Sequence, residues 1–112
     1  RAGVPVSNGS DCPVELPDVM AGVQCAVTRR SLDGVGPYLP EEAFTLREAL
    51  DSFTAQGTRA SFEEGEKGRV APGYLADFVI LDQDPFQTDP MALHSIPVRE
   101  TYLAGEQVYR RE

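Results

Sequence analysis

The amino-acid sequence predicts an α+β fold in the order of one short strand, two helices and then three or four short strands. Apolar residues at helical spacing mark residues 17–30 and 45–53, whereas the apolar run at residues 78–81 is short and β-branched. Residues 98–109 read as two short strands around an Ala-Gly-Glu turn, a pattern typical of a β-hairpin. The second half of the chain is therefore expected to contain three or four short strands.

A short strand and a first helix are expected at the start of the chain. Residues 1–6 place two valines on one face of an extended segment, and the polar residues 7–13 then form a loop. Pro17 suits the first turn of a helix over residues 17–30, because a first-turn residue needs no N–H. The apolar face of this helix is expected to contain Val19, Val23, Ala26 and Val27.

A second helix is expected to begin after Thr45. Thr45 and Glu48 have the spacing of a capping box, in which each side chain accepts a hydrogen bond from the other residue's backbone. Gly57 is expected to end the helix, with a further helical turn at residues 58–62. The buried stripe is expected to contain Leu46, Ala49, Leu50 and Phe53.

The expected sheet begins after a turn. Pro72-Gly73 favours a type II turn. The strand over residues 78–81 is expected to be buried, and Asp77 and Asp82 at its ends are expected to serve as turn or cap residues.

The composition and net charge of the chain argue against nucleic acid and anionic membranes as partners. The chain has 112 residues, which suits one ordinary domain. With 18 acidic and 10 basic residues its formal net charge is −8, so neither nucleic acid nor an anionic membrane is expected as its main partner. Cys12 and Cys25 form no C-x-x-C pair, and we expect two free thiols in the cytoplasm.

The chain holds few residues from which a complete catalytic site could be built. It has one histidine, His94, and two cysteines, so a self-contained metal or nucleophile–base site is hard to assemble. The chain also begins with Arg1, inside the expected strand. We therefore expect it to be a piece of a longer protein.

Four segments follow one another in an order known from a protein family. Residues 9–14 read G-S-D-C-P-V, residues 46–50 read L-R-E-A-L, and residues 68–82 read G-R-V-A-P-G-Y-L-A-D-F-V-I-L-D. The fourth segment covers residues 98–109, with V-R-E-T-Y-L-A-G and then V-Y. Together they resemble the C-terminal part of the amidohydrolase superfamily, in particular its amidohydrolase 3 or YtcJ-like branch.

The resemblance implies a fold that this chain contains only in part. Residues 1–62 would be the C-terminal end of a (β/α)8 barrel, with its last strand, catalytic loop and closing helices. Residues 63–112 would be the C-terminal half of a composite β-sandwich. The partners implied are the missing N-terminal region of the same polypeptide and a small-molecule substrate.

The resemblance also implies a chemistry and one site residue. It gives Asp11 a catalytic role, in contact with a divalent metal, expected to be zinc, and as proton acceptor when water attacks an amide or cyclic amide. Without the resemblance, an aspartate after a strand is more often a turn or cap residue. Asp11, Cys12 and His94 are not expected to replace the family's absent histidine ligands, because adjacent side chains of an extended segment diverge. The isolated chain is therefore expected to bind no catalytic metal and to hydrolyse nothing.

A second hypothesis belongs to another functional class. The chain could be a non-catalytic interaction module that associates through exposed sheet edges, because edge strands present unpaired backbone groups to other chains. Self-association of the isolated chain is expected on the same ground.

Overall fold

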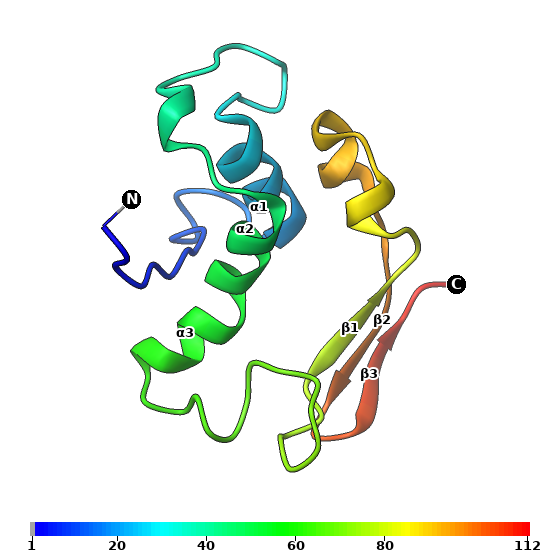
Figure 1. Ribbon diagram of the computed structural model, residues 1–112. Helices are drawn as coiled ribbons and strands as arrows, with labels where there is room; N and C mark the ends of the chain where they lie inside the picture. The colour runs from blue at the N-terminus through cyan, green and yellow to red at the C-terminus, as the bar shows by residue number, and fades with distance from the viewer. Residues whose placement is uncertain (1) are drawn as a thin grey trace.

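The computed structural model describes residues 2–112, with three helices on one side of the molecule and a three-stranded sheet on the other (Figure 1). The order of helices followed by three short strands agrees with the prediction from residue 17 onward. The elements in chain order are α1 (Val19–Thr28), the 3-10 turn η1 (Pro40–Glu42), α2 (Leu46–Phe53), α3 (Ala55–Ala60), β1 (Phe78–Leu81), the 3-10 turns η2 (Pro85–Gln87) and η3 (Pro90–Ser95), β2 (Val98–Leu103) and β3 (Glu106–Arg110).

The strand predicted over residues 1–6 is absent from its described part. Residues 2–6 have no regular secondary structure, and Arg1 lies outside the described residues. A strand needs a neighbour to pair its backbone groups, and the sheet within residues 2–112 contains only β1, β2 and β3. The side chains of Val4 and Val6 are consequently 71 % and 42 % exposed.

Helix α1 begins two residues later than predicted, and three of its four predicted core residues, Val23, Ala26 and Val27, lie at the core. The Asp18 carboxylate accepts a hydrogen bond from the Ala21 N–H at 3.1 Å, so Asp18 is the N-cap. The helix ends at Thr28, before the left-handed Arg29. Val19 is half exposed, so it does not belong to the buried face. The buried residues of the helix are Met20, Val23 and Gln24.

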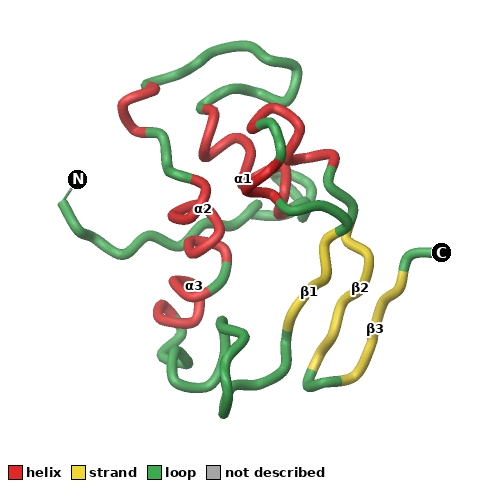
Figure 2. Tube along the Cα trace, turned by 45° about the vertical axis from the view of Figure 1, so that its right-hand side comes forward, coloured by secondary structure: helices red, strands yellow, loops and turns green. Residues whose placement is uncertain are grey.

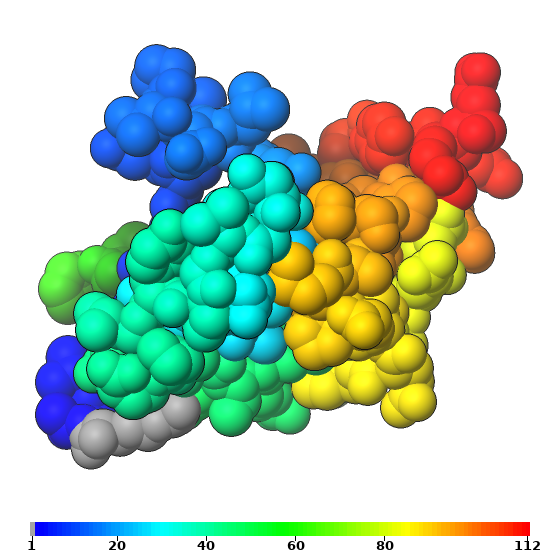
Figure 3. All heavy atoms as spheres, turned by 90° about the horizontal axis from the view of Figure 1, so that it is seen from above, coloured from blue at the N-terminus to red at the C-terminus, as the bar shows by residue number. Residues whose placement is uncertain are grey.

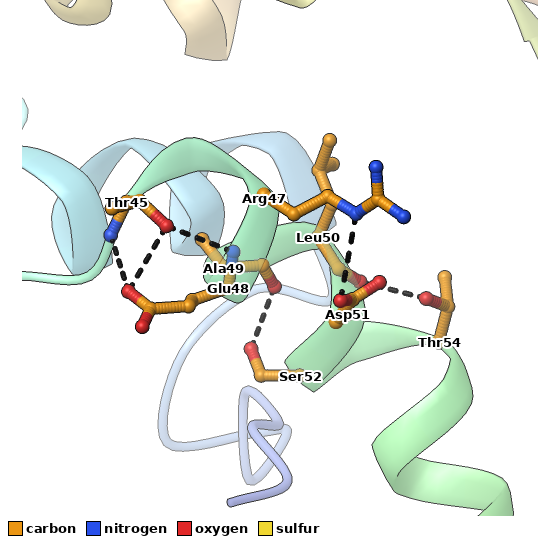
Figure 4. A network of polar contacts seen from close by, with 8 residues as sticks. All are labelled: Thr45, Arg47, Glu48, Ala49, Leu50, Asp51, Ser52 and Thr54. Carbon is orange, nitrogen blue, oxygen red and sulfur yellow. Dashed lines mark hydrogen bonds and ion pairs between the residues drawn. The ribbon is translucent and has the colours of Figure 1, made fainter. Parts of the chain in front are cut away.

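The predicted capping box starts α2 (Figure 4). The Glu48 carboxylate accepts from the Thr45 N–H at 2.8 Å, and the Thr45 hydroxyl accepts from the Glu48 N–H at 3.2 Å. Gly57 does not end this helix: Thr54, with φ −127° and ψ −94°, separates α2 from α3. Gly57 lies inside α3, where the cost of about 1 kcal/mol for a helical glycine is tolerated.

The three strands form one antiparallel sheet in the order β1-β2-β3 (Figure 2). The predicted β2–β3 hairpin is confirmed, and the rings of Phe78 and Tyr102 stack across β1 and β2 with centroids 4.7 Å apart. The turn before the sheet is also confirmed, since Tyr74 N–H donates to the Ala71 carbonyl and Gly73 has φ +86°. The predicted burial of β1 is wrong: Val79 is half exposed, because within residues 2–112 the sheet has no second layer.

The hydrophobic core lies between α1, α2 and η3. Figure 3 shows the yellow and orange part of the chain, which contains η2 and η3, packed against the cyan part of the helical half. Leu81 at the end of β1 packs against the edge of this core. The core thus joins residues from both halves of the sequence. Its buried members are Met20, Val23, Ala49, Leu93 and Ile96.

The helices are short. Within residues 2–112, none has both the length and the apolar character needed to cross a lipid bilayer. The longest, α1, has 10 residues.

The position of Leu93 in the core leads to a stability prediction. Leu93 is 1 % exposed, so Leu93→Ala leaves a cavity and is expected to lower the free energy of unfolding by about 2–5 kcal/mol. Leu103→Ala is the matched control, because Leu103 is 58 % exposed and should change the stability by less than about 0.5 kcal/mol. Urea unfolding followed by circular dichroism measures both. Equal effects of the two substitutions would contradict this description of the core.

Candidate active site

Asp11 lies at the start of an exposed turn between the N-terminal segment and α1. Its backbone is in the left-handed region, with φ +52°, and its carbonyl accepts a hydrogen bond from the Val14 N–H at 2.8 Å. Residues 11–18 are all exposed, and Figure 3 shows this blue part of the chain projecting from the body of the molecule. The backbone therefore presents the Asp11 side chain to solvent.

The carboxylate of Asp11 has no partner among residues 2–112. Within residues 2–112, no hydrogen bond or ion pair reaches it, so it serves neither as a helix cap nor as the acceptor of a side-chain turn. The helix cap at this point of the chain is Asp18 instead. A carboxylate with free lone pairs can accept a proton or bind a cation or a substrate donor.

The N-terminal segment is fastened to α2 three residues before Asp11. The Asn8 N–H donates to the Ser52 carbonyl at 3.0 Å, and the Asn8 side-chain amide donates to the Ser52 hydroxyl at 2.9 Å. Ser52 is 2 % exposed and Asn8 is half-buried. The sequence analysis missed both residues. The available signal was a small polar residue, Ser52, beside the predicted apolar stripe of α2.

The two thiols do not form a pair. Cys12 is exposed beside Asp11, whereas Cys25 is partly buried in α1, and both are free. Burial raises the pKa of the Cys25 thiol, and the negative charge of Glu15 raises it further. The raised pKa keeps Cys25 in its thiol form at neutral pH, which disfavours nucleophilic attack.

His94 belongs to the core contact between η3 and α1. The side-chain oxygen of Gln24 accepts from the His94 N–H at 2.9 Å and lies 2.7 Å from His94 Nδ1. Because this oxygen can only accept, Nδ1 carries the proton. Gln24 is fully buried and its Nε2 has no partner within the described residues. The sequence analysis missed Gln24, although its position four residues after Met20 was a usable signal.

The described residues do not by themselves fit a metal ion. Zinc in proteins binds about four protein or water ligands. Residues 2–112 contain no group of three His, Cys, Asp or Glu side chains placed to hold a metal, so Asp11, Cys12 and His94 do not form one. Asp11 could supply one carboxylate to such a site.

Of the two aspartates at the ends of β1, Asp77 serves a turn as predicted, whereas Asp82 forms ion pairs and not a turn or cap. Asp77 accepts a hydrogen bond from the Ala104 N–H of the hairpin turn at 2.8 Å. Asp82 binds Arg99 at 2.6 Å and also Arg111. A hollow of about 470 Å³ adjoins Asp82 and these arginines, and Asp11 is not among its lining residues.

Comparison with known proteins matches the chain to one protein family and to several individual relatives. The sequence model of the amidohydrolase family matches residues 1–109. The chain is 36 % identical over 111 residues to YtcJ of Bacillus subtilis (strain 168), which is named as an amidohydrolase; the match covers 97 % of this chain and 21 % of YtcJ. It is 34 % identical over 110 residues to the N-substituted formamide deformylase of Arthrobacter pascens, covering 98 % of this chain and 20 % of that protein.

A third relative matches the chain over nearly its whole length. The chain is 32 % identical over 115 residues to the imidazolonepropionase of Ectopseudomonas mendocina (strain ymp), covering 97 % of this chain and 24 % of that enzyme. The chain spans about a fifth to a quarter of the length of these relatives. No solved structure matches it.

The ion pairs of Asp82 predict a decline of stability in acid. The hydrogen bond from Arg99 holds the pKa of the Asp82 carboxyl below its ordinary value of 3.8, and the charge of Arg111 lowers it further. Stability from this group is complete above the ordinary pKa and is lost as the pH falls through the lower folded-state pKa. We therefore expect Asp82→Asn to be less stable than the unmodified chain at pH 7 and to lose less stability from about pH 5 to pH 2.

Urea midpoints measured across this pH range test the expectation. Glu64→Gln is the control, because Glu64 is an exposed loop carboxylate. Parallel pH curves for Asp82→Asn and the unmodified chain would show that the ion pairs contribute nothing.

Proposed function

Because the chain belongs to the amidohydrolase family, we propose that it is the C-terminal part of a longer hydrolase that cleaves the C–N bond of an amide or a cyclic amide. The observation that carries the proposal is the family match over residues 1–109, which includes the exposed Asp11 turn. One relative is named for the deformylation of N-substituted formamides, which contain such a bond. The substrate proposed is thus a small molecule with a carbonyl carbon bonded to nitrogen.

The surface of the chain supports its belonging to a larger structure. The accessible surface is 7860 Å², whereas a compact 12.2 kDa monomer exposes roughly 6,000 Å². Several large apolar side chains are almost fully exposed, among them Phe62 at 91 % and Val70 at 86 %. A surplus of nearly 2,000 Å² is comparable with a whole protein–protein interface. We assign this surplus to contacts with the remaining part of the same polypeptide.

The proposed division of the chain follows the order of its elements. Residues 1–62, which contain the Asp11 turn and the three α-helices, would close a (β/α)8 barrel. Residues 63–112, which contain the sheet, would complete a β-sandwich by adding to strands from elsewhere in the protein. The missing second layer over the sheet and the unpaired residues 2–6 are the features that such neighbours would complete.

The role proposed for Asp11 is proton transfer. Hydrolysis of a C–N bond requires that the attacking water lose a proton and that the leaving nitrogen gain one. A carboxylate with free lone pairs can accept the first proton and deliver it to the nitrogen. The exposed turn that contains Asp11 suits the rim of a barrel, where the active sites of such enzymes lie.

The metal expected from the family resemblance would need ligands from other parts of the longer protein. A divalent ion, zinc in particular, needs ligands that residues 2–112 do not provide as a set. In the longer protein Asp11 would be one ligand among several that other segments supply. The carboxylate of Asp11, which has no partner among residues 2–112, can transfer a proton without contribution from that ion.

Replacement of Asp11 tests this role. In the full-length gene product that contains this chain, Asp11→Asn is expected to lower kcat by about 10²–10⁴-fold, because an amide cannot accept the proton. The measurement is release of amine from a simple N-alkylformamide and ring opening of a simple lactam. Asp18→Asn is the control, because asparagine caps helix α1 about as well as aspartate. Near-normal turnover by Asp11→Asn would remove Asp11 from the chemistry.

The interaction-module hypothesis has one observation in its favour. Strands β1 and β3 are both edges of the sheet within residues 2–112, and every residue of β3 is exposed. Such edges can pair with another chain. The interaction-module hypothesis requires that the chain associate through its sheet edges, whether or not the longer protein is an enzyme.

Sedimentation equilibrium of the 112-residue chain tests the second hypothesis. We expect a dimer or larger assembly, and Val108→Lys on β3 should shift it toward monomer, because a charged edge disfavours strand pairing. Val70→Lys adds the same charge to an exposed loop residue outside the sheet and should have no effect. A strictly monomeric chain at high concentration would contradict this hypothesis.

A further inference from the structure

The Asp11 turn lies between a hydrogen-bonded contact with α2 on its N-terminal side and the start of α1 on its C-terminal side. Of residues 2–16, Asn8 alone donates or accepts a hydrogen bond to a helix, and both of its bonds go to Ser52. Two residues, Gly9 and Ser10, separate Asn8 from Asp11. The place of Asp11 relative to α2 therefore depends on this pair.

A second hydrogen bond of Ser52 determines which group donates in its contact with Asn8. Its hydroxyl donates to the Ala49 carbonyl at 2.6 Å, as Figure 4 shows, so its one hydrogen is already used. The hydroxyl oxygen can then only accept from Asn8, and the amide nitrogen of Asn8 must face it. Ser52 also lies in the last turn of α2, where backbone carbonyls lack partners within the helix, so its carbonyl is free to accept the Asn8 N–H.

Burial makes this contact resistant to water. Ser52 is 2 % exposed, and an unsatisfied polar group at such a site is costly. The two bonds also constrain both the backbone and the side chain of Asn8, which a single bond would not do. We propose that Asn8 and Ser52 form a clamp that positions the Asp11 turn for catalysis, with Ser52 as a positioning residue rather than a catalytic one. The catalytic consequence rests on the proposed function of Asp11.

The clamp is tested first in the 112-residue chain by amide hydrogen exchange. Ser52→Ala is expected to speed exchange at the Asn8 and Val14 amides by about five- to tenfold, because it removes one hydrogen bond of the clamp. Ser95→Ala is the matched control: the Ser95 hydroxyl donates to the Ala92 carbonyl three residues earlier, the same local pattern, but belongs to η3 and not to the clamp. Unchanged exchange in Ser52→Ala overturns the clamp.

The catalytic consequence is tested in the full-length gene product with the N-alkylformamide or lactam that the unmodified enzyme hydrolyses. Ser52→Ala should lower kcat by about tenfold with KM nearly unchanged, and Ser52→Thr, which keeps the hydroxyl, should restore most of kcat. Faster exchange with an unchanged kcat overturns the positioning role.

The hydrogen-exchange experiment and the kinetic experiment together distinguish failure of the clamp from failure of the proposed function. An unmodified full-length protein that hydrolyses neither probe, together with the expected change in exchange, counts against C–N hydrolysis of these probes and supports the clamp. Loss of kcat in Ser52→Ala without faster exchange at Asn8 and Val14 contradicts the clamp, since Ser52 would then act by another route.

Discussion

The packing of η3 against α1 is the contact on which the structure depends. Leu93 and Ile96 are buried against Met20 and Val23, and this is where the sheet-bearing half of the chain meets the helical half. Gln24, fully buried, binds both the backbone and the ring of His94 at the same place. Apolar burial supplies most of the stabilisation and the hydrogen bonds fix the register between the elements. Helix α2 and the sheet are then placed on either side of this contact.

Local sequence signals predicted the local structure well. The Thr45–Glu48 capping box, the turn at Gly73 and the hairpin of β2 and β3 each depend on a few neighbouring residues, and each is confirmed. The helix boundaries at Asp18 and Gly57 were local errors, whereas the absence of the first strand and the exposure of β1 depend on distant parts of a protein. Residues 2–6 have the pattern of a strand but no neighbour to pair with, and β1 has the composition of a buried strand but no second layer over it.

The candidate site was predictable only in part. Asp11 was recognised from the G-S-D-C-P-V segment and not from spacing or polarity, because an isolated aspartate in a loop has many ordinary roles. Its left-handed backbone, and the lack of a partner for its carboxylate among the described residues, are visible only in the structure. The Asn8–Ser52 contact joins residues 44 positions apart, and nothing in the local sequence of either residue identifies the other. Long-range pairs of this kind need a fold before they can be predicted.

The separation between Gln24 and His94 has a consequence for synthesis of the chain. The two residues are 70 positions apart, and a ribosome adding 5–20 residues per second needs about 3–14 s to pass from one to the other. During that interval α1, with 10 residues, can pack against α2 but lacks η3, and a helix so short is marginal in water. The buried face of α1 is therefore covered completely only after η3 has been synthesised.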